Sequence, residues 1–494
     1  GAAGQELNRM LHEVGIMRTD CYLTYACKQR PPEGIIGHWI ALKKKDIAQH
    51  HTLLRNLYCT YRIHERTAEL ETEVEMVQPN IIIAMGNLAS WALTGQWSVL
   101  KWRGSQLSTA KGIKVIPTLT PGAVMREWPQ RAAVLNDLRR VKRHMTSRTW
   151  DNKPEWRFLV RPSFHQAHST LGGLLADAGS RTLPLWLDFD IETRNGHIDC
   201  IGFSWSRTDA ICIPLMARGK PEGYWSADEE AILIFALYKL LTHPNVKVRW
   251  QNGLYDAQYV QRHWHFIPKN GQDTMITQHS VFCALPKGLG FIASLYCDWY
   301  VYWKDEGKIA SDVPEEQRWT YNLQDCIYTR EAGEVLQQTA EIMNLKEVDA
   351  HQQRLFMPVL KAMIRGVRIR HEVKNQMAMD IQEELSHREA FLYNVLGHTI
   401  NPSSPKQMQT LFYDDLKLPV IYKRVVAGGR TVMNPTCDDE ALTKIAAKEP
   451  LVKPICNAIA DIRTLNKFLG DFVNMPLDDD QRMRCSFNIA GDAG

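Results

Sequence analysis

The spacing of apolar residues changes along this chain, and that change restricts the folds that it can adopt. Short continuous apolar runs, typical of buried strands, occur at residues 80–84 and 185–191. From about residue 344 onward, longer stretches with helical spacing replace them. Because the chain has 494 residues, more than one hydrophobic core is needed to bury its apolar side chains. We therefore expect an α/β multidomain protein whose last part is mostly helical.

The patterns divide the chain into three predicted domains and one linker. Residues 1–146 alternate helical and strand-like segments, which predicts a layered α/β domain. Residues 147–182 begin within a polar, basic run and are predicted to be a linker. Residues 183–343 form a second α/β domain, and residues 344–494 form the mostly helical part.

Individual elements follow from the same patterns. Asn195 and Gly196 separate two strand-like runs and predict a meander at the start of the second domain. Strands are expected at residues 80–84, 114–117, 185–191, 198–206, 210–215 and 246–250. Helices are expected at residues 5–14, 228–241, 352–364, 372–396 and 451–474, with one or two long helices across residues 46–78.

Composition excludes few classes of protein. The net charge of +4 permits nucleic-acid binding through local patches but does not argue for it. Apolar runs are too short to cross a bilayer, so we expect no membrane partner. Eleven scattered cysteines fit a reducing compartment, which predicts a cytoplasmic protein. The absence of an initiator Met and the Gly-rich last residues lead us to expect that the sequence is cut at both ends.

Paired carboxylates in the second domain are the most informative chemical feature. Asp190 and Glu192 lie at the end of the first predicted strand of this domain, and side chains two residues apart in a strand share a face. Two neighbouring carboxylates repel each other unless a cation lies between them. Oxygen ligands of this kind suit Mg²⁺. The pair therefore predicts a site for a divalent cation.

Further acids and a phenol follow in positions that suit the same chemistry. Asp256 opens a predicted helix after the strand at residues 246–250. Tyr321 and Asp325 are four residues apart on a helical stretch and so share a face. Four acids and a phenol are the groups that two-metal hydrolysis of a phosphodiester requires.

These segments, in this order, resemble the three exonuclease motifs of the DEDDy 3′→5′ proofreading domains of family A DNA polymerases. The resemblance implies a ribonuclease H-like fold and two bound Mg²⁺ or Mn²⁺ ions. It implies that Asp190, Glu192 and Asp325 hold the first ion. Asp190 would also contact the second ion, and Asp256 would reach it directly or through water.

The same resemblance assigns roles in substrate binding. Tyr321 would position the attacking water, and Thr193 and Asn252 would contact the terminal nucleotide. Asp188 departs from the family's usual apolar residue and shares a face with Asp190. We expect Asp188 to be a surface or edge acid, because Thr193 sets the register of the motif on Asp190. If Asp188 were a ligand, the ligand set would shift by one pair.

The helical part resembles the beginning of a family A polymerase domain. The resemblance lies in residues 363–369, 401–404, 460–467 and 482–488. It implies part of a thumb region, truncated before the palm. Arg463 and Lys467, which are four residues apart, could then contact duplex phosphates. A solvated helix face explains a single charge of this kind equally simply.

The first domain resembles the family 4 or 5 uracil-DNA glycosylases. The resemblance covers most of residues 1–140, including Arg103-Gly104 and residues 83–89 and 117–126. The family's acidic first motif would lie before Gly1, so we expect the domain to be incomplete at its N-terminus. Thr120 stands where the family has His. Because a hydroxyl supports a developing uracil anion far less well than an imidazole, an inactive binding module is favoured over an active glycosylase.

The family's iron–sulfur cluster is not predicted here. Cys21, Cys27 and Cys59 do not reproduce its four-cysteine spacing.

Together these patterns predict a fragment of a phage-type DNA polymerase that retains 3′→5′ exonuclease chemistry. DNA is the expected partner, as a single-stranded 3′ end and as a primer-template, in the cytoplasm of the host cell. A replisome or processivity factor is left open as a further partner. Two alternatives remain: a uracil-DNA recognition or glycosylase repair protein, and a catalytically inactive DNA-binding scaffold.

Overall fold

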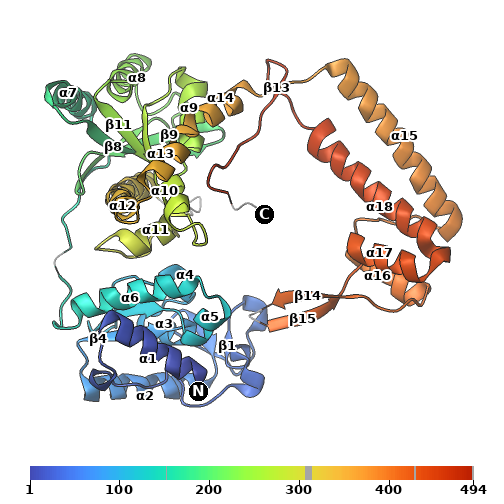
Figure 1. Ribbon diagram of the computed structural model, residues 1–494, viewed down its shortest axis with the longest axis horizontal. Helices are drawn as coiled ribbons and strands as arrows, with labels where there is room; N and C mark the ends of the chain where they lie inside the picture. The colour runs from blue at the N-terminus through green and yellow to red at the C-terminus, as the bar shows by residue number, and fades with distance from the viewer. Residues whose placement is uncertain (152, 306–313, 428–429, 492–494) are drawn as a thin grey trace. The chain divides into compact units, whose positions relative to one another are not determined.

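The computed structural model describes residues 1–151, 153–305, 314–427 and 430–491. The chain divides into two compact units, one of residues 1–361 with 487–494 and one of residues 362–486. The first unit contains an N-terminal domain (residues 1–150) and a central domain (residues 153–361), both of mixed α/β structure (Figure 1). The second unit is mostly helical. The predicted α/β multidomain fold class is confirmed.

The N-terminal domain has three layers around a small sheet of order β4-β6-β5. Alternate residues of the strands face opposite layers. Ile116 packs with α1, α5 and α6, and the adjacent Val115 packs with α2 and α3. The strands are β4 (Ile81–Met85), β5 (Leu107–Ser108) and β6 (Lys114–Thr118). The helices are α1 (Ala2–Val14), α2 (Tyr61–Val77), α3 (Asn87–Thr94), α4 (Val99–Trp102), α5 (Pro121–Arg126) and α6 (Gln130–His144).

The long helical stretch predicted at residues 46–78 is only partly present. Helix α2 occupies the second half, but residues 52–59 form an antiparallel hairpin that pairs with β1. Arg55 has a left-handed φ of 55° in the turn of this hairpin, a conformation that ends helical propagation. The three strands are β1 (Ile40–Ala41), β2 (Thr52–Leu54) and β3 (Leu57–Cys59).

A six-stranded sheet organises the central domain, with the order β12-β11-β8-β9-β10-β7. The predicted meander is present, because β9 is antiparallel to both β8 and β10. Asn195 and Gly196 form its first turn with φ of 51° and 81°. The strands are β7 (Arg157–Leu159), β8 (Leu185–Arg194), β9 (His197–Ser204), β10 (Asp209–Pro214), β11 (Val246–Trp250) and β12 (Asn270–Asp273).

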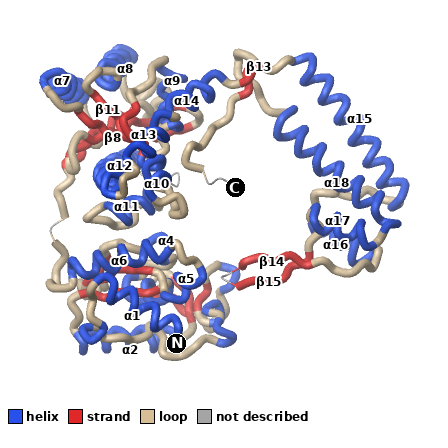
Figure 2. The backbone as a smooth tube through the Cα atoms, in the orientation of Figure 1, coloured by secondary structure: helices blue, strands red, loops and turns tan. Residues whose placement is uncertain are grey.

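Helices cover both faces of this sheet (Figures 1 and 2). Helices α7 and α8 pack together on one face, and the long helix α12 lies across β8, β9 and β10 on the other. The helices are α7 (Phe164–Ser180), α8 (Ala227–Leu241), α9 (Leu254–Trp264), α10 (Thr274–Val281), α11 (Leu289–Tyr296), α12 (Glu315–Ile342), α13 (Lys346–Arg354) and α14 (Phe356–Arg365).

Two predicted domain boundaries differ from the structure. Residues 147–182 are not a linker, because β7 pairs in parallel with β10 and α7 packs on α8. A capping box of Ser163 and Gln166 starts α7, a signal that the preceding basic run obscured. The boundary predicted after residue 343 moves to residue 361. Helix α13 belongs to the central domain because it packs on α10, and Gln353 accepts a hydrogen bond of 2.9 Å from the backbone N–H of Asp273.

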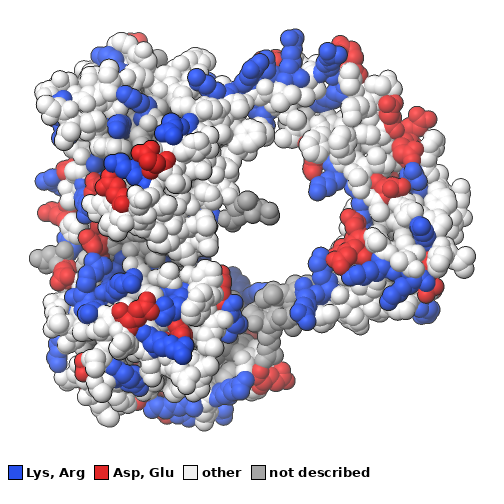
Figure 3. Space-filling view, in the orientation of Figure 1, with Lys and Arg blue, Asp and Glu red and all other residues white. Residues whose placement is uncertain are grey.

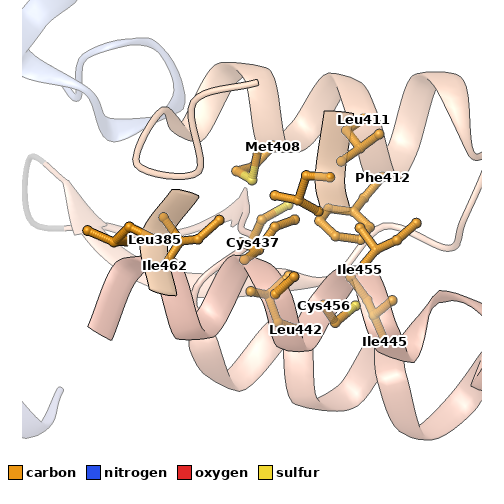
Figure 4. Packing of buried hydrophobic residues seen from close by; sticks show 13 residues of the cluster. Leu385, Met408, Leu411, Phe412, Cys437, Leu442, Ile445, Ile455, Cys456 and Ile462 are labelled. Atoms are coloured by element: carbon orange, nitrogen blue, oxygen red, sulfur yellow. The ribbon is translucent and has the colours of Figure 1, made fainter. Parts of the chain in front are cut away.

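The second unit is a helical layer with one long hairpin. Helices α15, α17 and α18 enclose a cluster that includes Leu442, Ile445 and Ile455, whose side chains point toward one another in Figure 4. The helices are α15 (His371–Leu396), α16 (Pro405–Gln409), α17 (Asp439–Lys448) and α18 (Lys453–Phe468), with π-helical turns at Thr410–Asp415 and Leu469–Val473. The strands are β13 (Val367–Arg368), β14 (Tyr422–Ala427), β15 (Arg430–Pro435) and β16 (Arg482–Met483).

The surface agrees with an ordinary globular composition. Lys and Arg side chains alternate with Asp and Glu on the visible face of both units, without a patch of one sign that dominates either (Figure 3). Each described helix is too short or too polar to cross a lipid bilayer.

Candidate carboxylate and metal site

Helix α12 meets one face of strand β8, and this contact builds the site. Asp190 and Glu192 point toward α12, as their spacing in the strand predicts. The amide of Asn322 on α12 donates to Asp190 Oδ2 at 2.7 Å. Gly202 of β9 lies opposite Asp190 in the sheet, and a Cβ at Gly202 would overlap the Asn322 amide. Glycine therefore permits the close approach of α12 that brings its acids to β8.

Three acids of the predicted set converge. Asp190, Glu192 and Asp325 each offer a carboxylate oxygen, and these oxygens lie within 4.8 Å of one another. Asp190 and Glu192 belong to strand β8, whereas Asp325 belongs to helix α12 and follows Glu192 by 133 residues in the sequence. Oxygen atoms at this spacing suit a hard divalent cation. The donor set therefore fits the Mg²⁺ or Mn²⁺ that the sequence predicts.

Asp256 joins this group from a different direction. Strand β11 pairs with β8 only as far as Asp188, so the backbone N–H of Ile191 lies beyond the ladder. Asp256, in the first turn of α9, accepts a hydrogen bond of 2.9 Å from that N–H. Its carboxylate is thereby fixed beside the residue that separates Asp190 from Glu192. We call Asp190, Glu192, Asp256 and Asp325 the carboxylate cluster.

The cluster holds its acids in an unfavourable electrostatic environment. Burial, followed by repulsion from Asp256, Asp325 and Glu192, raises the pKa of Asp190. Burial and repulsion from Asp325 raise the pKa of Glu192 to about 7. Burial chiefly raises the pKa of Asp256 to about 8. Burial and mutual repulsion thus favour the protonated forms of these acids, and a bound cation would favour their ionised forms instead.

Two cations that sequence analysis missed offset part of this charge. Lys304 Nζ donates to Asp325 Oδ2 at 2.6 Å and to the Tyr321 hydroxyl at 2.9 Å. Burial opposes the charge of Lys304, but Asp325 and Tyr321 outweigh that effect and raise its pKa. Arg318 contacts Glu192 Oε2 at 3.4 Å and the buried Asp199 at 3.0 Å. Neither residue belongs to a recognisable motif, so spacing along the sequence carried no signal for them.

Tyr321 lies beside the cluster, one turn before Asp325 on α12. Burial and the charge of Asp325 raise the pKa of Tyr321, so its hydroxyl keeps its proton near neutral pH. Trp303 donates from Nε1 to Asp325 Oδ1 at 2.6 Å. The phenol is thus positioned as a neutral hydrogen-bonding group within reach of the acids.

The two predicted nucleotide-contacting residues lie on elements that carry acids of the cluster: Thr193 follows Glu192 in β8, and Asn252 precedes α9, which carries Asp256. Thr193 shares a hydrogen bond of 2.7 Å with the hydroxyl of Tyr255. Asn252 is exposed and adopts a left-handed φ of 62° in the turn before α9. Asp273 accepts from the backbone N–H groups of Asn252 and Gly253 at 3.1 and 2.8 Å and so fixes this turn.

Asp188 is not the surface or edge acid that the sequence suggested. It is completely buried and forms ion pairs with Arg249 at 2.9 Å and Arg330 at 2.5 Å. The two arginines come from β11 and α12 and were not identifiable as its partners from local spacing. Because both cations neutralise Asp188, the acids left to bind a metal are Asp190 and Glu192.

The two predicted phosphate-contacting residues of the second unit are in different environments. Arg463 donates to the carbonyl oxygens of Pro402 at 2.8 Å and Cys437 at 2.9 Å and pairs with Asp439. Its hydrogen-bonding groups are therefore used within the fold. Lys467 is exposed on the same helix, α18.

Several motif residues of the N-terminal domain have structural contacts. Thr120 caps α5 by accepting from the Ala123 N–H. Cys21 packs on one face of the sheet, whereas Cys27 and Cys59 pack on the other. All eleven cysteines are free thiols in the part of the chain that the structure describes.

Comparison with known proteins relates the parts of the chain to two groups of DNA enzymes. Residues 1–139 match the family model for the uracil DNA glycosylase superfamily. A type-4 uracil-DNA glycosylase of Thermotoga maritima is 30% identical over 146 residues, which cover 29% of this chain and 65% of that protein. DNA polymerase I of Treponema pallidum is 25% identical over 189 residues, 38% of this chain and 18% of that protein.

The chain is a polymerase-related protein with a uracil-DNA glycosylase-like N-terminal domain. Its matches span less than a fifth of the Treponema polymerase and just under two thirds of the Thermotoga glycosylase. The solved POL domain of Pol1 from M. smegmatis, in complex with DNA primer-template and dNTP, aligns with 67% of this chain and 52% of its own. Its sequence identity is 15% and its TM-score is 0.48.

Proposed function

We propose that the central domain is a metal-dependent 3′→5′ exonuclease acting on DNA. One observation carries the proposal: oxygens of Asp190, Glu192 and Asp325 lie within 4.8 Å of one another. Asp256 is held beside them by the Ile191 N–H. Buried acids crowded to this degree are costly unless a cation binds between them. The similarity to DNA polymerase I supports DNA as the substrate.

The residues of the cluster divide the chemistry among them. Asp190, Glu192 and Asp325 would hold one divalent ion, and Asp190 with Asp256 would hold a second. Bound ions supply a hydroxide nucleophile and stabilise the leaving 3′ oxygen. The neutral Tyr321 hydroxyl orients the attacking water by a hydrogen bond. Thr193, next to Glu192 in β8, and the exposed Asn252, in the turn before α9, contact the terminal nucleotide.

The wider context of this activity is proofreading within a DNA-directed polymerase. The helical second unit then belongs to the polymerase domain of a phage-type family A enzyme that works in the host cytoplasm. Lys467 is exposed and suits contact with duplex phosphates, whereas the guanidinium of Arg463 is used within the fold.

Nucleotide release from 3′-labelled single-stranded DNA with Mn²⁺ tests the exonuclease proposal. The variant with both Asp190→Ala and Glu192→Ala should lose activity by about 10²–10³-fold or more, as when transition-state charge stabilisation is removed. A matched control changes two exposed acids of the N-terminal domain, Asp46→Ala and Glu65→Ala, and should keep its activity. Equal rates for the two variants would refute the assignment.

A second candidate function is uracil recognition by the N-terminal domain. The match of residues 1–139 to the uracil DNA glycosylase superfamily favours it. Thr120 uses its hydroxyl to cap α5, so we propose binding rather than base release. Uracil-containing single-stranded DNA separates the possibilities. Release of the uracil base in EDTA indicates a glycosylase. DNA binding in EDTA with no base release, and with no nucleotide release in Mn²⁺, indicates a binding scaffold.

A further inference from the structure

One segment of the central domain joins the N-terminal domain to the carboxylate cluster. We call residues 294–305 the strap; it runs from the end of α11 toward the cluster. Its backbone forms hydrogen bonds with the N-terminal domain at Tyr300 and at Tyr302. The Gln106 N–H donates to the Tyr300 carbonyl at 2.8 Å, and the Tyr302 N–H donates to Ser105 Oγ at 3.1 Å.

Two buried arginines of the N-terminal domain hold the beginning of the strap. Arg140 donates to the carbonyl oxygens of Ser294 at 3.2 Å and Cys297 at 2.6 Å. Arg103, which is 1% exposed, donates to Ser294 Oγ at 2.6 Å while it pairs with Asp137. Arg103 belongs to the Arg-Gly motif shared with glycosylases. In this protein its guanidinium is enclosed and bound to the strap.

Polar contacts at the rim add to this attachment. Lys101 pairs with Asp305 at 3.1 Å, and Arg143 pairs with Asp298 at 2.7 Å. The Asn136 amide donates to the Leu295 carbonyl at 2.9 Å. The strap is thus bound to the N-terminal domain along most of its length.

The other end of the strap contacts the carboxylate cluster. Trp303 and Lys304 contact the two oxygens of Asp325 at 2.6 Å each. Trp303 also stacks on Tyr328 of α12, with ring centroids 4.1 Å apart. Lys304 additionally donates to the Tyr321 hydroxyl. A contact network therefore runs from the N-terminal domain to a proposed metal ligand and to the proposed water-orienting phenol.

We propose that the N-terminal domain acts as a scaffold for the exonuclease site, because it fixes the strap so that Lys304 positions Tyr321 and Asp325. This inference rests on the proposed exonuclease function. Lys304 is a positioning residue: its ammonium restrains the phenol and shields one oxygen of Asp325. A cation at this place repels a divalent ion and competes for that oxygen. Lys304 therefore lowers metal affinity while it raises the turnover number.

Lys304→Met tests the role of the ammonium, with Lys304→Arg as the variant that keeps the charge. The Mn²⁺ binding that Asp190→Ala abolishes is taken as binding at the carboxylate cluster. We expect Lys304→Met to tighten this binding by about tenfold and to lower kcat by about tenfold. Lys304→Arg should stay closer to the wild-type affinity. General damage to the site would weaken Mn²⁺ binding. Weaker or unchanged Mn²⁺ affinity in Lys304→Met would overturn the assignment.

A second experiment tests the scaffold in the full chain. The strap variant combines Lys101→Glu and Asn136→Asp. The first substitution places a negative charge beside Asp305, and the second places a carboxylate, which cannot donate, beside the Leu295 carbonyl. The control, Lys111→Glu with Asn80→Asp, makes the same changes in the same domain, where Lys111 pairs with Glu75 and Asn80 donates to the Met145 carbonyl. We expect the amide of Tyr302 to exchange hydrogen about tenfold faster in the strap variant than in the control.

Metal affinity then decides between coupling and mere contact. The strap variant should bind Mn²⁺ more tightly than the control, in the same direction as Lys304→Met. A strap that loosens without any change in Mn²⁺ affinity would overturn the scaffold role, as would equal exchange in the two variants. If the wild-type chain releases no nucleotides, the exonuclease proposal fails. The exchange and Mn²⁺ measurements still decide the coupling, because neither depends on turnover.

Discussion

Two clusters of buried charge in the first unit are built in opposite ways. In the N-terminal domain, Asp137 accepts hydrogen bonds from Arg103 at 2.5 and 3.0 Å and from Thr118 at 2.6 Å. In the central domain, the four acids of the carboxylate cluster share two nearby cations, Lys304 and Arg318. A buried carboxylate with matching cations can stay ionised, whereas a buried carboxylate with too few partners either binds a proton or binds a cation. The difference separates a structural ion pair from a proposed metal site.

The largest effect should come from breaking the paired cluster. Arg103→Met leaves Asp137 buried without its main partner, so we expect a loss of about 3–5 kcal/mol in the free energy of unfolding. Urea denaturation of the full chain measures it. Arg66→Met, which removes an arginine from an exposed pair with Glu69, is the control and should change stability by less than about 1 kcal/mol. Similar losses in both variants would remove the distinction drawn between buried and exposed pairs.

The unpaired cluster should make the metal-free protein less stable as the pH rises. The folded pKa values of Glu192 and Asp256, about 7 and about 8, exceed their ordinary values of 4.5 and 3.8. Between these limits the folded state binds more protons than the unfolded state, so stability decreases with pH throughout this window. Within its window, each group lowers the free energy of unfolding by up to about 1.4 kcal/mol for every unit of pH.

Thermal melting in EDTA measures this dependence, and melting with Mn²⁺ is its control. A bound divalent ion replaces the protons, so the decline should flatten when Mn²⁺ is present. A melting temperature that rises with pH in EDTA would show that the cluster is neutralised by the protein itself.

A single neutral substitution should relieve part of the same repulsion. Asp256→Asn keeps an oxygen that accepts from the Ile191 N–H but removes a buried charge. We expect the metal-free protein at about pH 8 to gain about 1–3 kcal/mol. The gain should vanish at about pH 5, where Asp256 is already protonated in the folded state. Destabilisation at both pH values would indicate that Asp256 is not an unpaired charge.

The smallest effects separate the two basic residues of α18. Arg463→Ala should destabilise the second unit by about 1–3 kcal/mol, because two carbonyl oxygens lose a charged donor. Lys467→Ala should change stability by less than about 0.5 kcal/mol. If Lys467 contacts a phosphate, its removal lowers the salt dependence of duplex binding by about one counterion. Binding titrations at several salt concentrations measure this, and an unchanged slope would assign Lys467 to a solvated face.

Strands and helices with strong local patterns were predictable from the sequence. The meander of β8, β9 and β10 and the strand at residues 246–250 occur where alternation and turn residues placed them. Prediction failed where local signals were weak. The hairpin at residues 52–59 lay within an apparently helical stretch. Likewise, β7 is three residues long and depends on pairing with β10, which periodicity does not reveal.

The candidate site was predictable in its acids but not in its cations. Asp190, Glu192 and Asp325 carry order and spacing, and the structure brings their oxygens together. Lys304 and Arg318 reach the cluster from segments without a motif. Asp188 shares the spacing of the ligand pair, yet Arg249 and Arg330 neutralise it. Spacing along a strand indicates which face a carboxylate occupies, but only the residues packed against that face decide whether its charge is paired.

The sequence by itself determined the mixed α/β multidomain class and the acids on one face of β8, because both depend on local periodicity. Only the tertiary structure decided that the N-terminal domain binds the strap and that the strap places Trp303 and Lys304 on Asp325. The contacts between the N-terminal domain and the strap join residues far apart in the sequence, such as Asn136 and Leu295 with a separation of 159 and Lys101 and Asp305 with a separation of 204. Those inter-domain contacts depend on the docking of two folded domains, and the contacts of Trp303 and Lys304 with Asp325 depend on the packing of the strap against α12. No periodicity within a single element specifies either.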